Sequence, residues 1–353
     1  MILRVVVLKS VLSSVPPDMP MQQLFCAIVI GILNDLAENC VVLVDDGNLT
    51  TKELFEAARG WPIKFRTNIL KLLTLLRTRN RFVKIPNGYA LAEKCVEITC
   101  KHCIGIANAT APVAVISAEP CLCPNANLTN APAVNVHDYS TSAFHEFRTK
   151  ARVYQLNRGE WDQQTFERKV LAPLFSDAKL VKIYDRWIGN SIVTRSYDQK
   201  VLPSTQVQER FRNALDWIVS VFLATCTQPT RRLEVYSGVD TRNKDRNEIA
   251  ITVAALKAFE ADIRSRHKFP LFTLIIKEEA RQSRMLQHGR YLLTDQIGIV
   301  MERGFDLLMD DQAMRDMGLD PKRDIRRVHD CLVAYSPDAT KIESVVRTLV
   351  DLA

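Results

Sequence analysis

Apolar residues in the first part of the chain occur in short runs and at helical spacing, separated by polar breaks. Two runs, Leu3–Leu8 and Val41–Val44, have the length of buried strands. The stretch around Met21–Glu38 predicts a helix, and its most apolar part, Leu24–Leu33, is too short to span a bilayer. Residues Ile63–Thr78 carry leucines at helical spacing with basic residues around them, which predicts a second helix.

A turn signal follows these helices. The segments RFVKI and YALA flank Pro86-Asn87-Gly88, and Asn-Gly supplies the positive φ angles of a tight hairpin turn. Two helices followed by a hairpin are loosely similar to a winged helix, so this segment either contacts DNA or only packs. Residues 107–132 are rich in Ala, Pro, Asn and Thr, which indicates a connector. We expect an N-terminal domain over 1–94, a cysteine-containing connector over 95–140 and a larger domain over 141–353.

The larger domain alternates helical and strand patterns. The expected helices are Thr165–Asp177, Thr205–Thr225, Asn247–Arg264, Lys322–Leu332 and Lys341–Leu352. The expected strands are Leu180–Tyr184, Arg232–Tyr236, Leu271–Ile276, His288–Leu293 and Ile297–Met301. Alternation of this kind predicts a sheet flanked by helices. The fold class is therefore α/β, with a smaller α/β or winged-helix-like N-terminal domain.

Composition narrows the functional classes. The 353 residues are 47% hydrophobic and 25% charged, as in globular domains, and the net charge is +7. That excess fits a polyanionic partner such as nucleic acid, an anionic lipid head group or an acidic protein. Nine cysteines, an odd number without a framework spacing, and the absence of a convincing signal peptide or transmembrane segment lead us to expect a reducing cytoplasm.

Four of the cysteines form two close pairs. Cys100 and Cys103 make a C-x-x-C pair, and Cys121 and Cys123 make a C-x-C pair. Four thiolates from two such pairs match a structural zinc site, although the second spacing is shorter than usual. The alternative is that these cysteines are reduced, partly buried thiols. With four protein ligands, zinc would have no open position for chemistry.

The strongest chemical signal is the segment from His288 to Asp295, HGRYLLTD. On a strand, positions 288 and 290 share a face, so an imidazole and a guanidinium would project together. Histidine can attack phosphorus, and Arg290 can stabilise charge on phosphoryl oxygens. Asp295 would orient an imidazole or serve the second half of the reaction. The alternative for His288 is a core histidine bound to a backbone carbonyl.

This spacing resembles the HxKxxxxD signature of the phospholipase D superfamily, over residues 151–353. The strand around Lys182–Ile188 is similar to an early strand of such domains, and Gly304-Phe305-Asp306 stands where the family often has Gly-Ser-x-Asn. The resemblance implies a phospholipase D-like sheet and metal-independent cleavage of phosphodiesters through a phosphohistidine. The family's active site uses two motifs and this chain has one, which implies a homodimer.

Two substitutions depart from the family pattern. Arg290 replaces the lysine, and a guanidinium clamps phosphate in a bidentate fork where lysine acts as a point charge. Asp306 replaces the asparagine and brings a negative charge near a phosphate site. The segment also resembles the C-terminal domain of MIT-domain proteins, a branch in which the fold persists as a binding module for membranes and partners.

Further basic residues are candidates for phosphate or nucleic-acid contacts. They are Arg186, Lys277, Arg281, Arg284 and Arg303. For at least half of the basic residues near the motif, the alternative is that they lie on a solvated helix surface and bind no phosphate.

Three functions remain open. The first is a nucleic-acid phosphodiesterase, suited by analogy to a bacterial defence or mobile-element system. The second is an inactive phospholipase D-like module that binds nucleic acid, phospholipid head groups or a partner protein. The third is a structural subunit of a larger complex.

Overall fold

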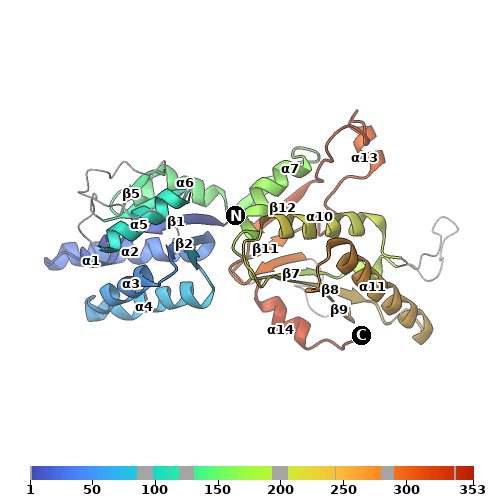
Figure 1. Cartoon of the computed structure of the whole chain (residues 1–353), viewed down its shortest axis with the longest axis horizontal. Coiled ribbons are helices and arrows are strands. Elements are labelled where there is room, and N and C mark those ends of the chain that lie inside the picture. Colours follow the sequence, from blue (N-terminus) through green and yellow to red (C-terminus); the bar gives the residue numbers. More distant parts are fainter. Residues whose placement is uncertain are drawn as a thin grey trace. The chain divides into compact units, whose positions relative to one another are not determined.

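The computed structural model describes residues 2–85, 98–110, 112–118, 131–192, 206–242, 244–279, 290–337 and 339–353. The chain forms two compact units, Ile2–Arg152 and Val153–Ala353 (Figure 1). Each unit contains one β-sheet flanked by helices, which confirms the α/β class.

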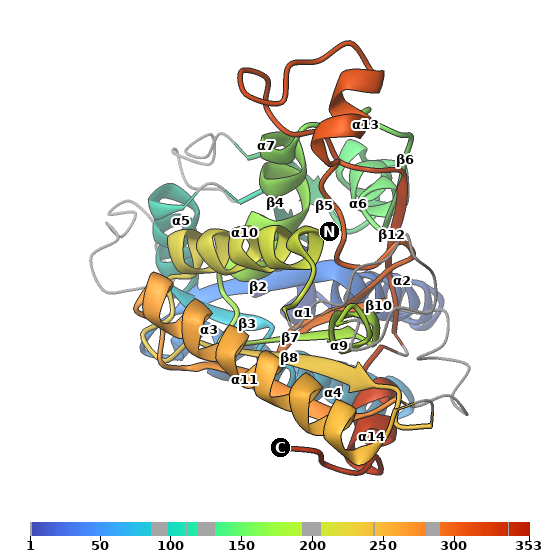
Figure 2. The ribbon, with the colours of Figure 1, turned by 90° about the vertical axis from the view of Figure 1, so that its right-hand side faces the viewer.

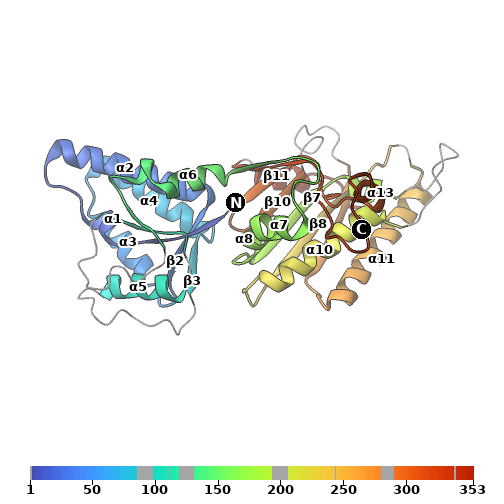
Figure 3. The same ribbon diagram turned by 90° about the horizontal axis from the view of Figure 1, so that it is seen from above.

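The first unit has a five-stranded sheet in which every strand pair is parallel. The order is β3 (Phe82–Ile85), β2 (Cys40–Asp45), β1 (Leu3–Val7), β4 (Ala114–Ser117) and β5 (Ala133–Asn135). The helices are α1 (Ser10–Ser13), α2 (Met19–Asn39), α3 (Leu49–Arg59), α4 (Ile63–Thr78), α5 (Ile98–Ala109) and α6 (Ala143–Lys150). Figure 3 shows α2, α4 and α6 on one side of the sheet and α3 and α5 on the other.

The predicted helices around Met21–Glu38 and over Ile63–Thr78 are confirmed as α2 and α4. Among the described residues, α2 is the one helix long and apolar enough to cross a membrane. Length and composition alone do not separate a membrane span from a core helix. Phe25, Val29, Ile32 and Leu36 are buried in the core of the first unit.

The predicted connector was wrong in its described parts. Residues 114–117 and 133–135 form β4 and β5 of the first sheet, because β4 pairs with β1. Helix α6 also belongs to this unit, so the units divide after Arg152 and not near residue 140. The described part of the segment predicted to resemble a winged helix also differs from that prediction, because β3 pairs in parallel with β2. The predicted Asn87-Gly88 turn lies outside the described residues.

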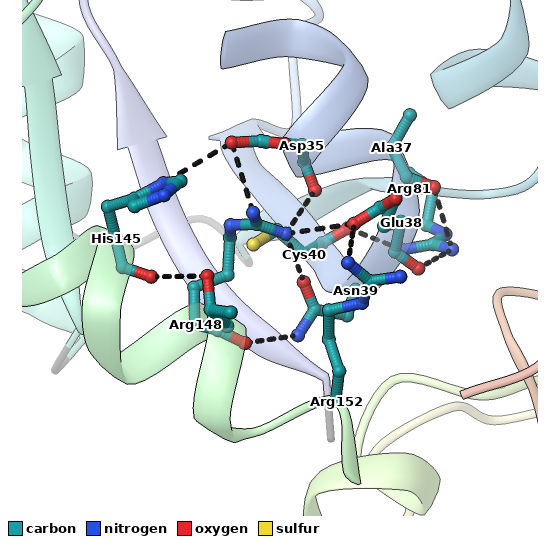
Figure 4. Close-up of polar contacts among 10 residues, drawn as sticks. Asp35, Ala37, Glu38, Asn39, Cys40, Arg81, His145, Arg148 and Arg152 are labelled. Carbon is teal, nitrogen blue, oxygen red and sulfur yellow. Dashed lines mark hydrogen bonds and ion pairs between the residues drawn. The ribbon is translucent and has the colours of Figure 1, made fainter. Parts of the chain in front are cut away.

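The C-terminal end of α2 is fixed by two buried arginines (Figure 4). Helix α2 runs directly into β2, and Arg81 donates to the carbonyl oxygens of Ala37, Glu38 and Cys40. Arg148 of α6 donates to the Asp35 carbonyl at 3.3 Å. Cations at this end also interact favourably with the helix dipole.

Arg148 makes ion pairs in the same cluster. Its guanidinium lies 3.0 Å from the Asp35 carboxylate and 3.1 Å from the Glu38 carboxylate, and Asn39 donates back to the Arg148 carbonyl at 3.2 Å. The Cys40 thiol lies beside them, and burial raises its pKa to about 12, so it stays protonated. The cluster joins α6 to α2 and closes the first unit.

The second unit has a seven-stranded mixed sheet. The order is β6 (Val153–Leu156), β12 (Cys331–Tyr335), β11 (Gly298–Met301), β10 (Arg290–Thr294), β7 (Leu180–Asp185), β8 (Arg232–Val239) and β9 (Phe272–Glu278). The pairs β7–β8 and β8–β9 are parallel, and the other pairs are antiparallel.

Helices cover both faces of this second sheet. They are α7 (Gln163–Phe166), a π-helical turn (Glu167–Leu171), α8 (Ala172–Phe175), α9 (Trp187–Asn190), α10 (Glu209–Thr225), α11 (Arg246–His267), α13 (Asp311–Asp316) and α14 (Lys341–Arg347). Figure 1 shows α10 above the sheet and α14 below it, and Figure 2 shows α10 and α11 beside each other. Ile342 and Val346 of α14 pack against Tyr184 and Tyr291.

Most expected elements of the second unit are confirmed, but the helix predicted over Lys322–Leu332 was wrong. Residues 322–330 form turns and isolated bridges, and Cys331 begins β12. Basic residues at helical spacing suggested the helix. Strand pairing decides the outcome, because β12 inserts between β11 and β6 and its backbone groups are satisfied on both sides.

Arg148→Met should destabilise the first unit strongly. The substitution keeps the volume but leaves the carboxylates of Asp35 and Glu38 without this buried partner, and breaking a buried pair costs about 3–5 kcal/mol. Urea denaturation of the full chain measures the loss.

The matched control is Arg152→Met. Arg152 contacts the same Glu38 carboxylate at 3.2 Å, but its side chain is 38% exposed. Exposed ion pairs contribute about 0–1 kcal/mol, so the control should lose little. Equal losses in the two variants would contradict the role assigned to Arg148.

Candidate functional site

The candidate site lies at one edge of the second sheet, where β7 and β8 end and β10 begins. β7 ends at Asp185, whose register partner on β8 is Ser237. Tyr184 pairs with Tyr291, which places Arg290 at the start of β10 next to the end of β7. Because side chains alternate along strands, Asp185, Ser237 and Arg290 share one face of the sheet. The carboxyl ends of parallel strands are a common location for ligand sites.

Asp185 is the best-fixed side chain of this edge. It is 1% exposed, and its two carboxylate oxygens accept the backbone N–H groups of Trp187 at 2.8 Å and Phe305 at 3.0 Å. Burial raises the pKa of Asp185 above its ordinary value, against the lowering by these N–H groups and by Arg290. Asp185 therefore ties the end of β7 to the loop after β11.

Two guanidinium groups meet at one aromatic ring beside Asp185. Arg290 Nε lies 4.0 Å from an Asp185 carboxylate oxygen, and the Arg290 side chain is 14% exposed. The Trp187 ring centre is 4.5 Å from the Arg186 guanidinium carbon and 6.0 Å from that of Arg290. Both distances are within the range of cation–π attraction. The ring and the carboxylate hold Arg290 at the edge of the sheet.

Arg186 belongs to a second polar network. Its guanidinium lies 3.0 Å from Glu279, and the other oxygen of Glu279 accepts from Asn190 at 3.0 Å. Asn190 in turn accepts the backbone N–H of Asp240 at 2.8 Å. The Glu279 side chain is 7% exposed, so this pair is well shielded from water. The network joins the ends of β8 and β9 to α9.

One buried hydroxyl at this edge is unsatisfied. Ser237 is fully buried, and its Oγ has no hydrogen-bond partner among the residues described. Buried polar groups are nearly always hydrogen-bonded, by the protein, a ligand or water. Ser237 lies beside Asp185 on the shared face, but its Oγ has almost no exposed surface, so a ligand cannot reach it in this conformation.

Gly304 allows the loop after β11 to approach Asp185 and Arg290. Its φ is +95°, and a Cβ there would lie 2.9 Å from an Asp185 oxygen and 3.0 Å from Arg290 Cγ. Both the conformation and the space therefore require glycine. This is the first residue of the Gly304-Phe305-Asp306 element singled out from the sequence.

The structure separates Arg290 from Asp295. Arg290 begins β10 and Asp295 follows its last residue, so their Cα atoms are five residue steps of about 3.3 Å apart, roughly 16 Å. The Asp295 carboxylate accepts the backbone N–H groups of Lys179 and Leu180 at the start of β7. Asp295 therefore fixes the far end of the β7–β10 pair. His288 lies outside the described residues.

The other predicted phosphate ligands are dispersed or paired. Lys277 contacts Asp351 at 3.3 Å, and Arg303 contacts Asp330 at 3.2 Å and Asp306 at 3.9 Å. Arg186 pairs with Glu279, as described above. Arg281 and Arg284 lie outside the described residues. Of the five, Arg186 is the one that the structure shows beside Trp187 with Arg290.

The zinc site stays a prediction. Cys100 and Cys103 both lie on α5, and Cys103 is buried with its Sγ 3.8 Å from the Val7 carbonyl oxygen. Cys121 and Cys123 lie outside the described residues, as does the side chain of Cys100. Within the described ranges no group of three or more potential metal ligands is present.

A hollow of about 830 Å³ lies beside α10 in the second unit. Its lining includes the acidic residues Glu209, Asp216, Asp310 and Asp311, against the two cations Arg210 and Arg326. Arg326 also pairs with Asp311. This lining is net negative and does not suit a polyanion.

Comparisons with known proteins identify no relative. No family model matches the chain, and neither a curated protein nor a solved structure matches it significantly.

Sequence reasoning identified Arg186 and the segment around Lys182–Ile188, which contains Asp185 and Trp187, but missed Glu279 and Asn190. Asp185 could be found because a carboxylate directly follows an apolar strand and precedes an arginine. Glu279 follows β9 in the same way, but nothing in its neighbourhood identifies Arg186 as a partner 93 residues away. The pairing depends on the parallel arrangement of β7, β8 and β9.

Gly304→Ala should destabilise the second unit more than Gly318→Ala. Both glycines have positive φ, +95° and +74°, which costs a non-glycine residue about 1–2 kcal/mol. A Cβ at Gly318 meets nothing within 4 Å, whereas one at Gly304 collides with Asp185 and Arg290. Urea midpoints of both variants measure the difference. Equal midpoints would show that Asp185 and Arg290 shift at little cost to make room for the added Cβ.

Proposed function

We propose that the second unit is a phospholipase D-like domain that binds nucleic-acid phosphate at the edge carrying Arg290 and acts as a metal-independent phosphodiesterase. The observation that carries the proposal is the fixed position of Arg290, a residue of the His288–Asp295 motif that Asp185 and Trp187 hold in place. Covalent geometry keeps the Cα of His288 within about 7 Å of that of Arg290. An imidazole and a guanidinium can therefore act on one phosphate.

The roles follow from the chemistry of the residues. His288 attacks phosphorus, the phosphodiester P–O bond breaks, and the leaving alkoxide takes a proton. Water then attacks the phosphohistidine, which releases the phosphate product and restores the imidazole. Arg290 stabilises the charge on the phosphoryl oxygens. A second copy of the chain supplies the second motif, and Asp295 takes no chemical step in this scheme.

A specific observation favours a second function, an inactive binding module. Arg186, Arg303 and Lys277 each contact a carboxylate, and Asp306 lies within reach of Arg303 and Arg210. Carboxylates that pair with these cations weaken the binding of an anionic phosphodiester. In this alternative the same edge binds nucleic acid, a phospholipid head group or a partner protein without turnover. Either function suits a cytoplasmic protein of a bacterial defence system.

Cleavage by the full-length protein in EDTA tests the first function. The substrates are single- and double-stranded DNA and RNA, and the variants are His288→Ala and Arg290→Ala. Loss of the nucleophile should reduce the rate by at least about a thousandfold. Loss of the guanidinium should reduce it by about 10²–10³-fold.

The matched control is Arg323→Ala, which removes one cation from a side chain that is 88% exposed and pairs with Asp320. Its cleavage rate should equal that of the wild type. If the wild-type dimer binds nucleic acid without cleaving it, and Arg290→Ala weakens that binding, the domain is a binding module and not an enzyme. Cleavage that survives His288→Ala would exclude the phosphohistidine.

A further inference from the structure

Positive charge is segregated in one segment of the first unit. Residues 57–92 contain eight lysines and arginines and no aspartate or glutamate, whereas the whole chain has a net charge of +7. Most of this segment is α4, which carries four basic residues and no acidic one. A solvated surface helix usually mixes both signs of charge. The segregation calls for a partner that is negative along its length.

The structure shows which face of α4 is open. Ile69, Leu73 and Leu76 are buried in the core of the first unit. The exposed residues at helical spacing on the opposite face are Lys64, Thr67, Asn68, Lys71, Thr74 and Thr78. We call these six residues the α4 face. Each of them can donate a hydrogen bond, and Lys64 and Lys71 lie about 10.5 Å apart along the helix.

The lysines of the α4 face are not neutralised. Among the described residues, neither Lys64 nor Lys71 has a carboxylate partner, in contrast to the paired cations Arg186, Arg303 and Lys277 of the second unit. Paired cations have little charge left for a ligand. The α4 face therefore carries unscreened positive charge that the candidate site lacks.

A cationic hollow lies near one end of this helix. It has a volume of about 410 Å³ and is lined by Lys52, Arg59, Arg77 and Phe55, with one acid, Glu56. The Arg77 guanidinium carbon lies 4.9 Å from the Phe55 ring centre. Cations beside an aromatic ring are typical of surfaces that follow a nucleic-acid strand.

We propose that the α4 face binds the sugar–phosphate backbone of a nucleic acid. A lipid surface fits less well, because a membrane-binding helix must turn its apolar face to the lipid, and that face of α4 is buried in the protein core. Exposed threonine and asparagine side chains are ordinary donors to phosphate oxygens. The inference extends the proposed function with a surface in the first unit, and it does not depend on the chemistry at Arg290.

The test is the salt dependence of binding by the full chain. The probes are fluorescein-labelled 30-mers of mixed sequence, as single- and double-stranded DNA and RNA, titrated at several NaCl concentrations. For duplex DNA, Lys64→Gln/Lys71→Gln should lower the slope of log K against log salt by about 1.8 and weaken binding at 0.1 M salt by about 10- to 100-fold. Lys64→Arg/Lys71→Arg should keep the wild-type slope.

The matched control is Lys179→Gln/Lys257→Gln, which removes the same charge from two exposed lysines, one just before β7 and one on α11, that have no carboxylate partner among the described residues. We expect a change in affinity of less than about twofold, because the charge is lost away from the α4 face. Equal weakening by both double variants would overturn the inference, and so would no weakening in the α4 variant. Urea midpoints close to the wild type confirm that all variants are folded.

Two further outcomes are decisive. Wild-type protein that binds vesicles of anionic phospholipid but none of the oligonucleotides would overturn the inference in favour of a membrane. If the α4 variant loses binding and neither the wild type nor any variant cleaves, the proposed phosphodiesterase is excluded and this inference stands. His288→Ala should abolish cleavage and keep the wild-type salt slope.

Discussion

The C-terminal end of α2 leaves carbonyl oxygens without helical partners, and two arginines from distant parts of the chain satisfy them. The helix passes directly into β2, so no glycine turn can cap it. Arg81 reaches the end of α2 from the start of β3, and Arg148 reaches it from α6. Two elements that are far from α2 in the sequence, β3 and α6, are thereby fixed to one helix end. Helix α4 packs beside α2 in the same unit.

The second unit uses a buried carboxylate in the corresponding way. Asp185 accepts two backbone N–H groups, from α9 and from the loop after β11, and it also faces Arg290. The charge arrangement of the two units is nevertheless different. Cations of the candidate site pair with carboxylates, whereas the two lysines of the α4 face have no carboxylate partner among the described residues. Under the two proposals made above, the first unit would attract a polyanion over distance and the second would hold one phosphate in a defined geometry.

Strongly apolar strands and amphipathic helices could be predicted from the sequence. Leu180–Tyr184 was found because a buried strand leaves a short, mostly apolar run. Ile63–Thr78 was found because burial of one stripe leaves a helical period. β4 and β5 were missed because four- and three-residue strands in Ala- and Pro-rich sequence show no period. Arg290 was recognised from local chemistry, and its separation from Asp295 follows from the length of a single strand. The pairing of Arg186 with Glu279 could not be recognised, because it depends on the register of β7, β8 and β9.

The arginine cap on α2 also determines where the chain can be cut. A fragment that stops near residue 140 would lack α6, so the carboxylates of Asp35 and Glu38 would lose Arg148 while the sheet itself remained complete. Such a fragment would look like a whole domain by its strands and yet keep only Arg81 at the end of α2, with two acids that have lost Arg148. A fragment that ends after Arg152 keeps the cap, so the smallest independent piece of this half is defined by a side-chain cluster and not by the last strand of its sheet.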